Sequence, residues 1–168
     1  MIHIVLTGGT IDSHWDGTTD TVVPNKESVI PDYVASLHLS QKVKYSEVCL
    51  KDSRAITMAD LKKLVRTIEA SPTRRVIVTH GTYTMADSAR YVKSHLKRQD
   101  QTVIFTGSFV PMDGFTFSDA PFNLGFSFAQ LEQLPTGVVY VCMGGKTFTA
   151  EEATKIITKG KFVSLFQS

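Results

Sequence analysis

The sequence predicts an α/β fold of the doubly wound type, with a mainly parallel sheet and helices on both of its faces. Short apolar runs rich in β-branched residues are continuous rather than alternating, as in strands that are covered on both sides. Segments with helical spacing separate these runs. Alternation of this kind implies right-handed crossovers, and ligands of such sheets bind beyond the carboxyl ends of the strands.

The strands are expected from the apolar runs, and the helices from spacing and from start signals. We expect central strands over residues 2–6, 76–78, 103–105 and 138–141, and a further strand over 43–50. We expect helices over residues 26–39, 57–70, 84–98 and 118–131.

The remaining segments give weaker signals. Residues 12–25 form a polar, turn-rich stretch that we interpret as a loop, with no helical period and little strand character. Thr149 to Glu152 has the pattern of a capping box and predicts a last helix, in which Lys155 would lie. The apolar cluster at 162–166 fits either a closing strand or a segment that docks on another copy.

Length and composition favour a single domain. The chain has 168 residues, 42% of them hydrophobic, which is enough for one substantial core. Its 18 basic and 16 acidic residues are scattered, so nucleic-acid binding is not indicated. Cys49 and Cys142 lie in apolar runs and predict no disulfide framework, and no segment is apolar enough to span a membrane or to act as a signal peptide. We therefore expect a cytoplasmic protein.

Three turns that combine glycine with hydroxyl residues follow the predicted strands. They are Thr7-Gly8-Gly9-Thr10, Thr79-His80-Gly81-Thr82 and Thr106-Gly107-Ser108. Glycine allows a close backbone approach, while hydroxyls and amides supply donors for a carboxylate or an oxyanion. Each turn alone has a plain interpretation as a strand-to-loop connection, but three at one sheet edge indicate a site for a small polar substrate. The phosphate-binding glycine motifs are missing, so we expect no nucleotide cofactor. We also expect no cofactor of another kind and no metal.

These turns resemble the signature motifs of the bacterial-type L-asparaginases. The likeness rests on Thr7-Gly8-Gly9-Thr10-Ile11, on Thr79 to Met85, and on Thr106-Gly107-Ser108 with Ser118 to Leu124. It spans nearly the whole chain but only the N-terminal domain of that family. We therefore expect one asparaginase N-terminal-like domain over residues 1–168, without the family's smaller C-terminal domain.

The resemblance implies a role for each matching residue. Thr10 matches the nucleophile, which would attack a side-chain amide and form an acyl intermediate, and Thr82 matches the second threonine of the site. Lys155 falls where the family has a lysine that supports that threonine. Ser53 matches a serine that holds the substrate's α-carboxylate, and Arg54 stands beside it, where a guanidinium could pair with a carboxylate. A lysine is otherwise most often a surface charge, and Ser53 could equally be a helix-capping or loop residue.

One position departs from the family pattern in a way that bears on the substrate. Tyr83 stands where the family has an aspartate that neutralises the substrate's α-ammonium, so a preference for an L-amino acid is in doubt. The loop over residues 12–25 contains His14 and Trp15 but not the family's mobile tyrosine. Tyr83 or His14 could act in its place, whereas we expect His80 to be a structural hydrogen-bonding residue.

Three hypotheses follow from the sequence. The first is an asparaginase-like amidohydrolase that releases ammonia from L-asparagine or a related small amide. The second is a catalytically impaired module that binds small carboxylates or amino acids. The third is a subunit that needs a separate chain to complete its site. In the family a neighbouring subunit closes each site, so we expect a homo-oligomer, with a dimer favoured.

Overall fold

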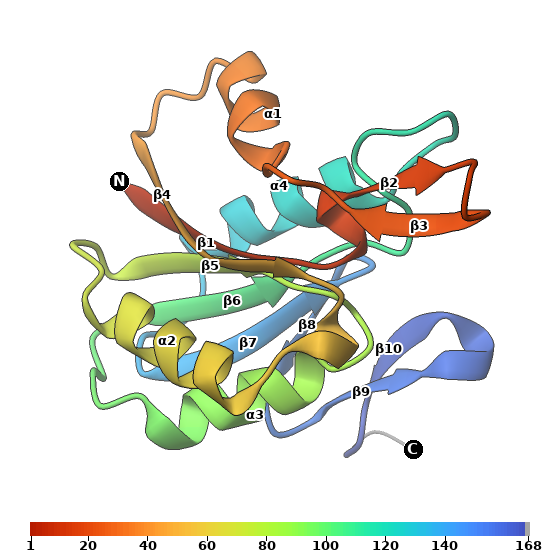
Figure 1. The fold of residues 1–168 in the computed structure, drawn as a ribbon. Helices are drawn as coiled ribbons and strands as arrows, with labels where there is room; N and C mark the ends of the chain where they lie inside the picture. The colour runs from red at the N-terminus through yellow and green to blue at the C-terminus, as the bar shows by residue number, and fades with distance from the viewer. Residues whose placement is uncertain (167–168) are drawn as a thin grey trace.

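A six-stranded sheet forms the centre of the computed structural model, which describes residues 1–166 (Figure 1). Its strand order is β4-β1-β5-β6-β7-β8; the first five strands are parallel, and β8 runs antiparallel to β7. The strands are β1 (Ile2–Gly8), β4 (Val43–Lys51), β5 (Arg75–Thr79), β6 (Thr102–Thr106), β7 (Val138–Met143) and β8 (Lys146–Thr149).

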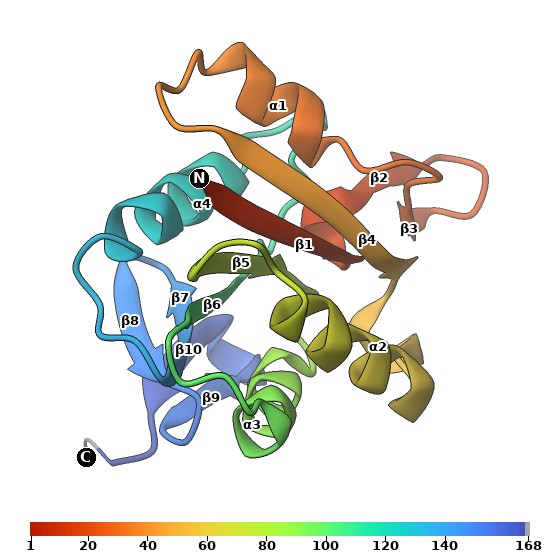
Figure 2. The ribbon, with the colours of Figure 1, turned by 90° about the vertical axis from the view of Figure 1, so that its left-hand side faces the viewer.

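Helices cover both faces of this sheet, as Figure 2 shows from the side. One face carries α1 (Ile30–Ser36) and α4 (Ala120–Gln130), and the other carries α2 (Met58–Glu69) and α3 (Met85–His95). The sequence prediction of a doubly wound, mainly parallel α/β fold is therefore confirmed.

Alternate residues of each central strand enter two separate cores, because successive side chains of a strand point to opposite faces. Val5, Val78 and Phe105 pack toward α2 and α3, whereas Ile4 and Ile104 pack toward α1 and α4. All five are completely buried. Burial on both faces explains why these strands read as continuous apolar runs in the sequence.

The helix boundaries follow local signals. Helix α2 begins with a capping box in which Thr57 and Asp60 satisfy each other's backbone N–H groups. Helix α1 is shorter than the predicted 26–39 and begins next to Pro31, which suits a first turn because it has no N–H to satisfy. Two hydrogen bonds to the buried Asp12, from Ser28 Oγ and from the Val29 N–H, fix the chain just before α1.

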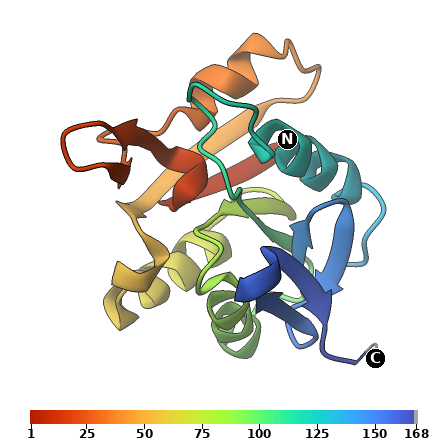
Figure 3. The ribbon, with the colours of Figure 1, turned by 90° about the vertical axis from the view of Figure 1, so that its right-hand side faces the viewer.

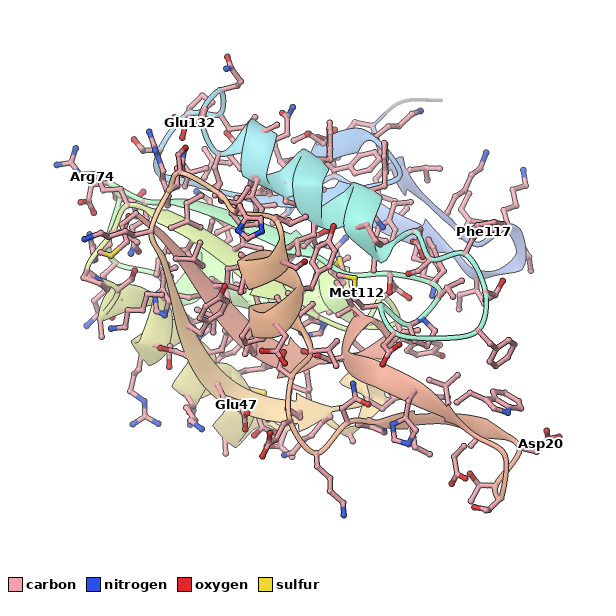
Figure 4. All side chains as sticks on the ribbon, turned by 90° about the horizontal axis from the view of Figure 1, so that it is seen from above. Asp20, Glu47, Arg74, Met112, Phe117 and Glu132 are labelled. Carbon is pink, nitrogen blue, oxygen red and sulfur yellow. The ribbon has the colours of Figure 1, made fainter. Side chains whose placement is uncertain are left out.

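Two small hairpins stand at the carboxyl end of the sheet, on either side of the strand ends (Figure 3). They pair β2 (Ser13–Asp16) with β3 (Thr21–Pro24), and β9 (Ala153–Ile156) with β10 (Lys161–Ser164). Figure 4 shows Asp20 and Phe117 at this end of the molecule, and Arg74 and Glu132 at the opposite end. The strand ends and both hairpins therefore surround the region where the sequence predicts the site.

Both hairpins correct the sequence predictions. Residues 12–25 include the strands β2 and β3 rather than a plain loop, since His14 and Trp15 pair with Val23 and Val22. The last helix predicted after Thr149 is wrong, and Lys155 lies in β9 instead.

The capping-box pattern at Thr149 closes a turn. Glu152 accepts the Thr149 N–H at 2.8 Å and donates its own N–H to Thr149 Oγ1. The second carboxylate oxygen of Glu152 accepts the Ser164 hydroxyl of β10 at 2.7 Å, so the turn is held to a strand. The cluster at 162–166 contributes to β10, which pairs with β9 and not with the central sheet.

Candidate functional site

The turns after β1 and β5 touch each other through glycine. Gly9 has a φ of 84°, and a Cβ atom built on it would lie 2.2 Å from the backbone nitrogen of Gly81. A Cβ on Gly81 would in turn lie 2.7 Å from the Ser53 side chain. Only glycine permits this approach, which brings the residues that follow, Thr10 and Thr82, to one place.

A cavity of about 240 Å³ opens at this contact. Its lining contains six of the site candidates from the sequence, drawn from four separate segments of the chain, but neither His14 nor the turn at residues 106–108. The lining residues are Gly9, Thr10, Asp52, Ser53, Arg54, Gly81, Thr82, Tyr83 and Lys155. The structure thus brings the six candidates together, although they span residues 10 to 155 of the sequence.

Lys155 reaches the cavity from β9. Its Nζ donates a hydrogen bond to Thr82 Oγ1 at 2.7 Å and lies 5.0 Å from the centre of the Phe109 ring. Burial of the ammonium lowers the pKa of Lys155 from its usual value near 10.5. The lysine is therefore a partner of Thr82 and more easily deprotonated than a surface lysine.

Ser53 and Arg54 follow β4 in a short 3₁₀ turn. Ser53 is buried, its Oγ accepts the Thr84 N–H at 3.4 Å, and its carbonyl accepts the Thr84 hydroxyl at 3.0 Å. The neighbouring Asp52 accepts the backbone N–H of Arg54 at 2.8 Å and holds its guanidinium through two further bonds. Ser53 therefore lines the cavity and also connects its own turn to the turn after β5 by hydrogen bonds.

The two threonines differ in their surroundings. Thr82 is buried and bound to Lys155, whereas the Thr10 hydroxyl makes no hydrogen bond to any of the residues that the structure describes. Tyr83, which follows Thr82, is 55% exposed, and its ring centre lies 5.7 Å from the Arg54 Cζ. Tyr83 and Arg54 therefore form the outer rim of the cavity.

The histidines lie outside the cavity lining. His80 is completely buried, and its Nδ1 donates to the Gly81 carbonyl at 2.8 Å. Burial lowers the pKa of His80 to about 4, so it is neutral near pH 7 and supports the Gly81 turn. His14 is exposed in the β2–β3 hairpin, where it pairs with Asn25 at 2.7 Å. This geometry agrees with a structural role for His80 and gives His14 no contact with the site.

Sequence reasoning missed two residues that shape the site. Asp52 precedes Ser53 and orders its turn, and an Asp two residues before an Arg at a strand end is a usable signal for such a cap. Phe109 covers Lys155, but its position depends on tertiary contacts, including a ring contact with Phe162 at 6.4 Å between centroids. No local pattern marks it.

The described residues show no cluster of three or more His, Cys, Asp or Glu side chains placed to hold a metal ion. Cys49 and Cys142 are buried free thiols. Within residues 1–166, no helix has both the length and the apolar character that a membrane crossing needs.

Solved structures with the same fold include three L-asparaginases. The thermostable L-asparaginase from Thermococcus kodakarensis is 23% identical with a TM-score of 0.83, and the match covers 100% of this chain and 52% of that one. A probable cytoplasmic L-asparaginase from Campylobacter jejuni is 23% identical with a TM-score of 0.82, covering 97% and 52%. L-asparaginase I from Vibrio cholerae is 24% identical with a TM-score of 0.78, covering 97% and 50%. The chain thus spans about half the length of these proteins.

Among curated proteins, the comparison finds no match. The profile of the asparaginase N-terminal domain, in contrast, matches residues 1–168, which include both threonine turns and Lys155. The sequence motifs, the fold and this match agree, and the chain belongs to the asparaginase family, of which it represents the N-terminal domain.

Proposed function

We propose that this chain is an amidohydrolase that releases ammonia from a small side-chain amide through a threonine nucleophile. The observation that carries the proposal is the hydrogen bond of 2.7 Å between Lys155 Nζ and Thr82 Oγ1, in a cavity that Thr10 also lines. A threonine hydroxyl is a weak nucleophile until a neighbouring group accepts its proton. A partly buried lysine beside a second hydroxyl supplies such a group.

In the proposed first step, Thr10 Oγ1 forms a bond to the amide carbon and the carbon–nitrogen bond breaks. The nitrogen leaves as ammonia, taking the proton that the Thr10 hydroxyl gives up. In the second step a water molecule adds to the ester, the bond to Thr10 Oγ1 breaks, and the threonine recovers a proton. Atoms and charges balance in both steps, with a carboxylic acid and ammonia as products.

Thr82 and Lys155 act in this scheme as the route for the proton. Neutral Lys155 can accept a proton that passes through Thr82, and its lowered pKa increases the fraction of neutral amine. Ser53 and Arg54 then provide a hydroxyl and a guanidinium for the carboxylate of the substrate. We retain Thr10 as the nucleophile on the family resemblance, since its free hydroxyl faces no competing hydrogen bond in the described residues.

Ammonia release from small amides tests the proposal. Wild-type protein should release ammonia, Thr10→Ala and Thr82→Ala should lose the activity, and Thr10→Ser should keep a measurable part of it because the hydroxyl remains. Equal ammonia release by wild type and Thr10→Ala would contradict the assignment of the nucleophile. No ammonia release from any small amide would contradict hydrolysis altogether.

A binding function without hydrolysis is the second candidate, and a specific observation favours it. Thr10 Oγ1 makes no hydrogen bond to a described residue that could take its proton. Under this hypothesis small carboxylates raise the melting temperature of wild type and of Thr10→Ala alike, while neither protein releases ammonia.

We further propose that a homodimer covers the cavity. Tyr83 and Arg54 at its rim are exposed, so a second copy could pack against them. Light scattering after size-exclusion chromatography should give twice the monomer mass. An inactive monomer would favour the third hypothesis, a site completed by a separate chain. A cytoplasmic location stays a prediction from the sequence.

A further inference from the structure

The cavity contains three charged side chains, and two of them are cations. These are Lys155 and Arg54, while Asp52 is the single anion of the lining. Asp52 already accepts the Arg54 backbone N–H at 2.8 Å, the Arg54 Nε at 3.0 Å and a terminal guanidinium nitrogen at 2.8 Å. These bonds lower the pKa of Asp52 and commit its carboxylate to Arg54. No free carboxylate of the lining is left to neutralise a cation.

Five carbonyl groups of the lining already accept hydrogen bonds. Gly9 O accepts from the Asp12 N–H and the Ser13 hydroxyl, and Gly81 O accepts from His80. The carbonyls of Thr10, Asp52 and Ser53 also accept bonds from later residues of their own turns. Since Asp52 is committed to Arg54 and these five carbonyls already accept hydrogen bonds, a bound ammonium would gain few new acceptors from them.

Hydrogen-bond donors, in contrast, are available. The backbone N–H groups of Thr82 and Tyr83 have no acceptor among residues 1–166, and the Ser53 hydroxyl donates to none of them. Together with Arg54 and Lys155 they make the cavity rich in donors, and its net charge is positive whenever Lys155 is protonated. Such a lining favours a bound anion and disfavours a substrate group that carries a positive charge.

We propose that the substrate is the monoamide of a dicarboxylic acid that has no ammonium group next to its carboxylate. This inference rests on the proposed function, because the amide is the group that the threonine attacks. Succinamate is the simplest member of the class and differs from L-asparagine only in lacking the ammonium. The remaining carboxylate lies against Arg54 and Ser53, and the amide lies against Thr10.

The decisive measurement compares kcat/KM for succinamate and L-asparagine on the wild-type protein. We expect a ratio of about ten or more in favour of succinamate, since an uncompensated like charge in a partly buried site costs on the order of 1.4 kcal/mol or more. A ratio of one or below overturns the inference and leaves amide hydrolysis standing.

Binding to Thr10→Ala separates the inference from the proposed function. Calorimetry should show tighter binding of succinamate than of L-asparagine to this variant, whether or not the wild type hydrolyses either compound. If the wild type is inactive and this order of affinity holds, hydrolysis fails and the ligand class stands. Equal or tighter binding of L-asparagine, or no binding of either compound, overturns the inference.

A matched pair of variants tests the electrostatic cause directly. Tyr83→Asp places a carboxylate at the cavity rim, and Tyr83→Asn places a neutral side chain of the same shape there. The succinamate preference should fall in Tyr83→Asp by about tenfold relative to Tyr83→Asn. An identical preference in the two variants would show that charge at the rim does not select the substrate, and would overturn the electrostatic argument.

Discussion

Two regions of different construction meet at the candidate site. The turns after β1 and β5 follow buried central strands, and two of their glycines are in backbone contact. The β9–β10 hairpin, which carries Lys155, lies outside that sheet, and within residues 1–166 its two strands pair with each other and with no further strand. The hydroxyl groups are therefore fixed by the core of the fold, whereas the lysine is positioned by a smaller unit.

A few anchors hold the hairpin. Ala153 and Phe162 enter the core beneath α3, and the Arg90 guanidinium donates to the Ala153 carbonyl. Glu152 ties the turn before β9 to Ser164 of β10. Substitutions in the strand-end turns should therefore disturb folding, while substitutions in the hairpin should disturb activity first.

Gly9→Ala should have the largest effect, because it disrupts the contact between the turns after β1 and β5. The new Cβ would overlap the Gly81 backbone at 2.2 Å, and the φ of 84° is unfavourable for alanine. We expect a loss of about 4 kcal/mol or more in the free energy of unfolding, or failure to fold. Chemical denaturation measures this change in the free energy of unfolding.

Gly125→Ala is the matched control for this change. Gly125 lies in α4, and a Cβ there would meet no atom within 4 Å. This variant should be stabilised by about 0.5–1 kcal/mol, as expected for alanine in a helix. Similar losses in both variants would refute the importance of the glycine contact.

Lys155→Met tests the second region. The methionine keeps much of the apolar stem but has no ammonium to bind Thr82, so kcat should fall on the order of 100-fold with little change in the melting temperature. Ammonia release and thermal unfolding measure the two effects. Lys159→Met, on the exposed turn of the same hairpin, is the control and should retain full activity.

The pH dependence of the rate sharpens this prediction. If the neutral amine accepts the proton, activity rises as pH increases through the pKa of Lys155. Because burial lowers that pKa, the midpoint of the rise should lie below 10.5. Lys155→Met should lose this limb of the profile. A wild-type rate that falls over the same range would contradict a basic role for the lysine.

His80, in the turn after β5, should make the free energy of unfolding depend on pH. Its pKa is lowered to about 4 in the folded protein, so between pH 6.5 and 4 the unfolded chain binds more protons at this residue. Acidification through this window should remove roughly 3 kcal/mol from the free energy of unfolding.

Denaturation of wild type and His80→Gln at several pH values checks this prediction. His3, whose pKa burial also lowers, is present in both proteins, so the difference between their profiles reports on His80. Parallel profiles for the two proteins would show that His80 does not contribute to the pH dependence of the unfolding free energy.

Glu152→Gln should have the smallest effect. The amide keeps one acceptor oxygen but loses the carboxylate that binds both the Thr149 N–H and the Ser164 hydroxyl. We expect a loss of about 1 kcal/mol in unfolding free energy. Glu151→Gln at the exposed neighbouring position is the control and should change nothing measurable. An equal loss in both variants would mean that the tie to β10 is unimportant.

The sequence by itself determined the doubly wound sheet and the place of the threonines. Continuous apolar runs such as Val103 to Phe105 arise because both faces of the strand are buried, and the glycines mark where the backbone turns closely. Parallel strands end at one edge of a sheet, which is why the sequence places Thr10 and Thr82 close together.

Only the tertiary structure decided that Lys155 lies in a strand, and which side chains contact it. The local pattern at Thr149 to Glu152 fits a helix start, but the same hydrogen bonds can close a turn, and Ser164 of a later strand selects the turn. The commitment of Asp52 to Arg54 and the ring of Phe109 over Lys155 likewise depend on how distant segments pack. Sequence spacing records local propensity, whereas charge compensation in a cavity depends on contacts between segments that are far apart along the chain.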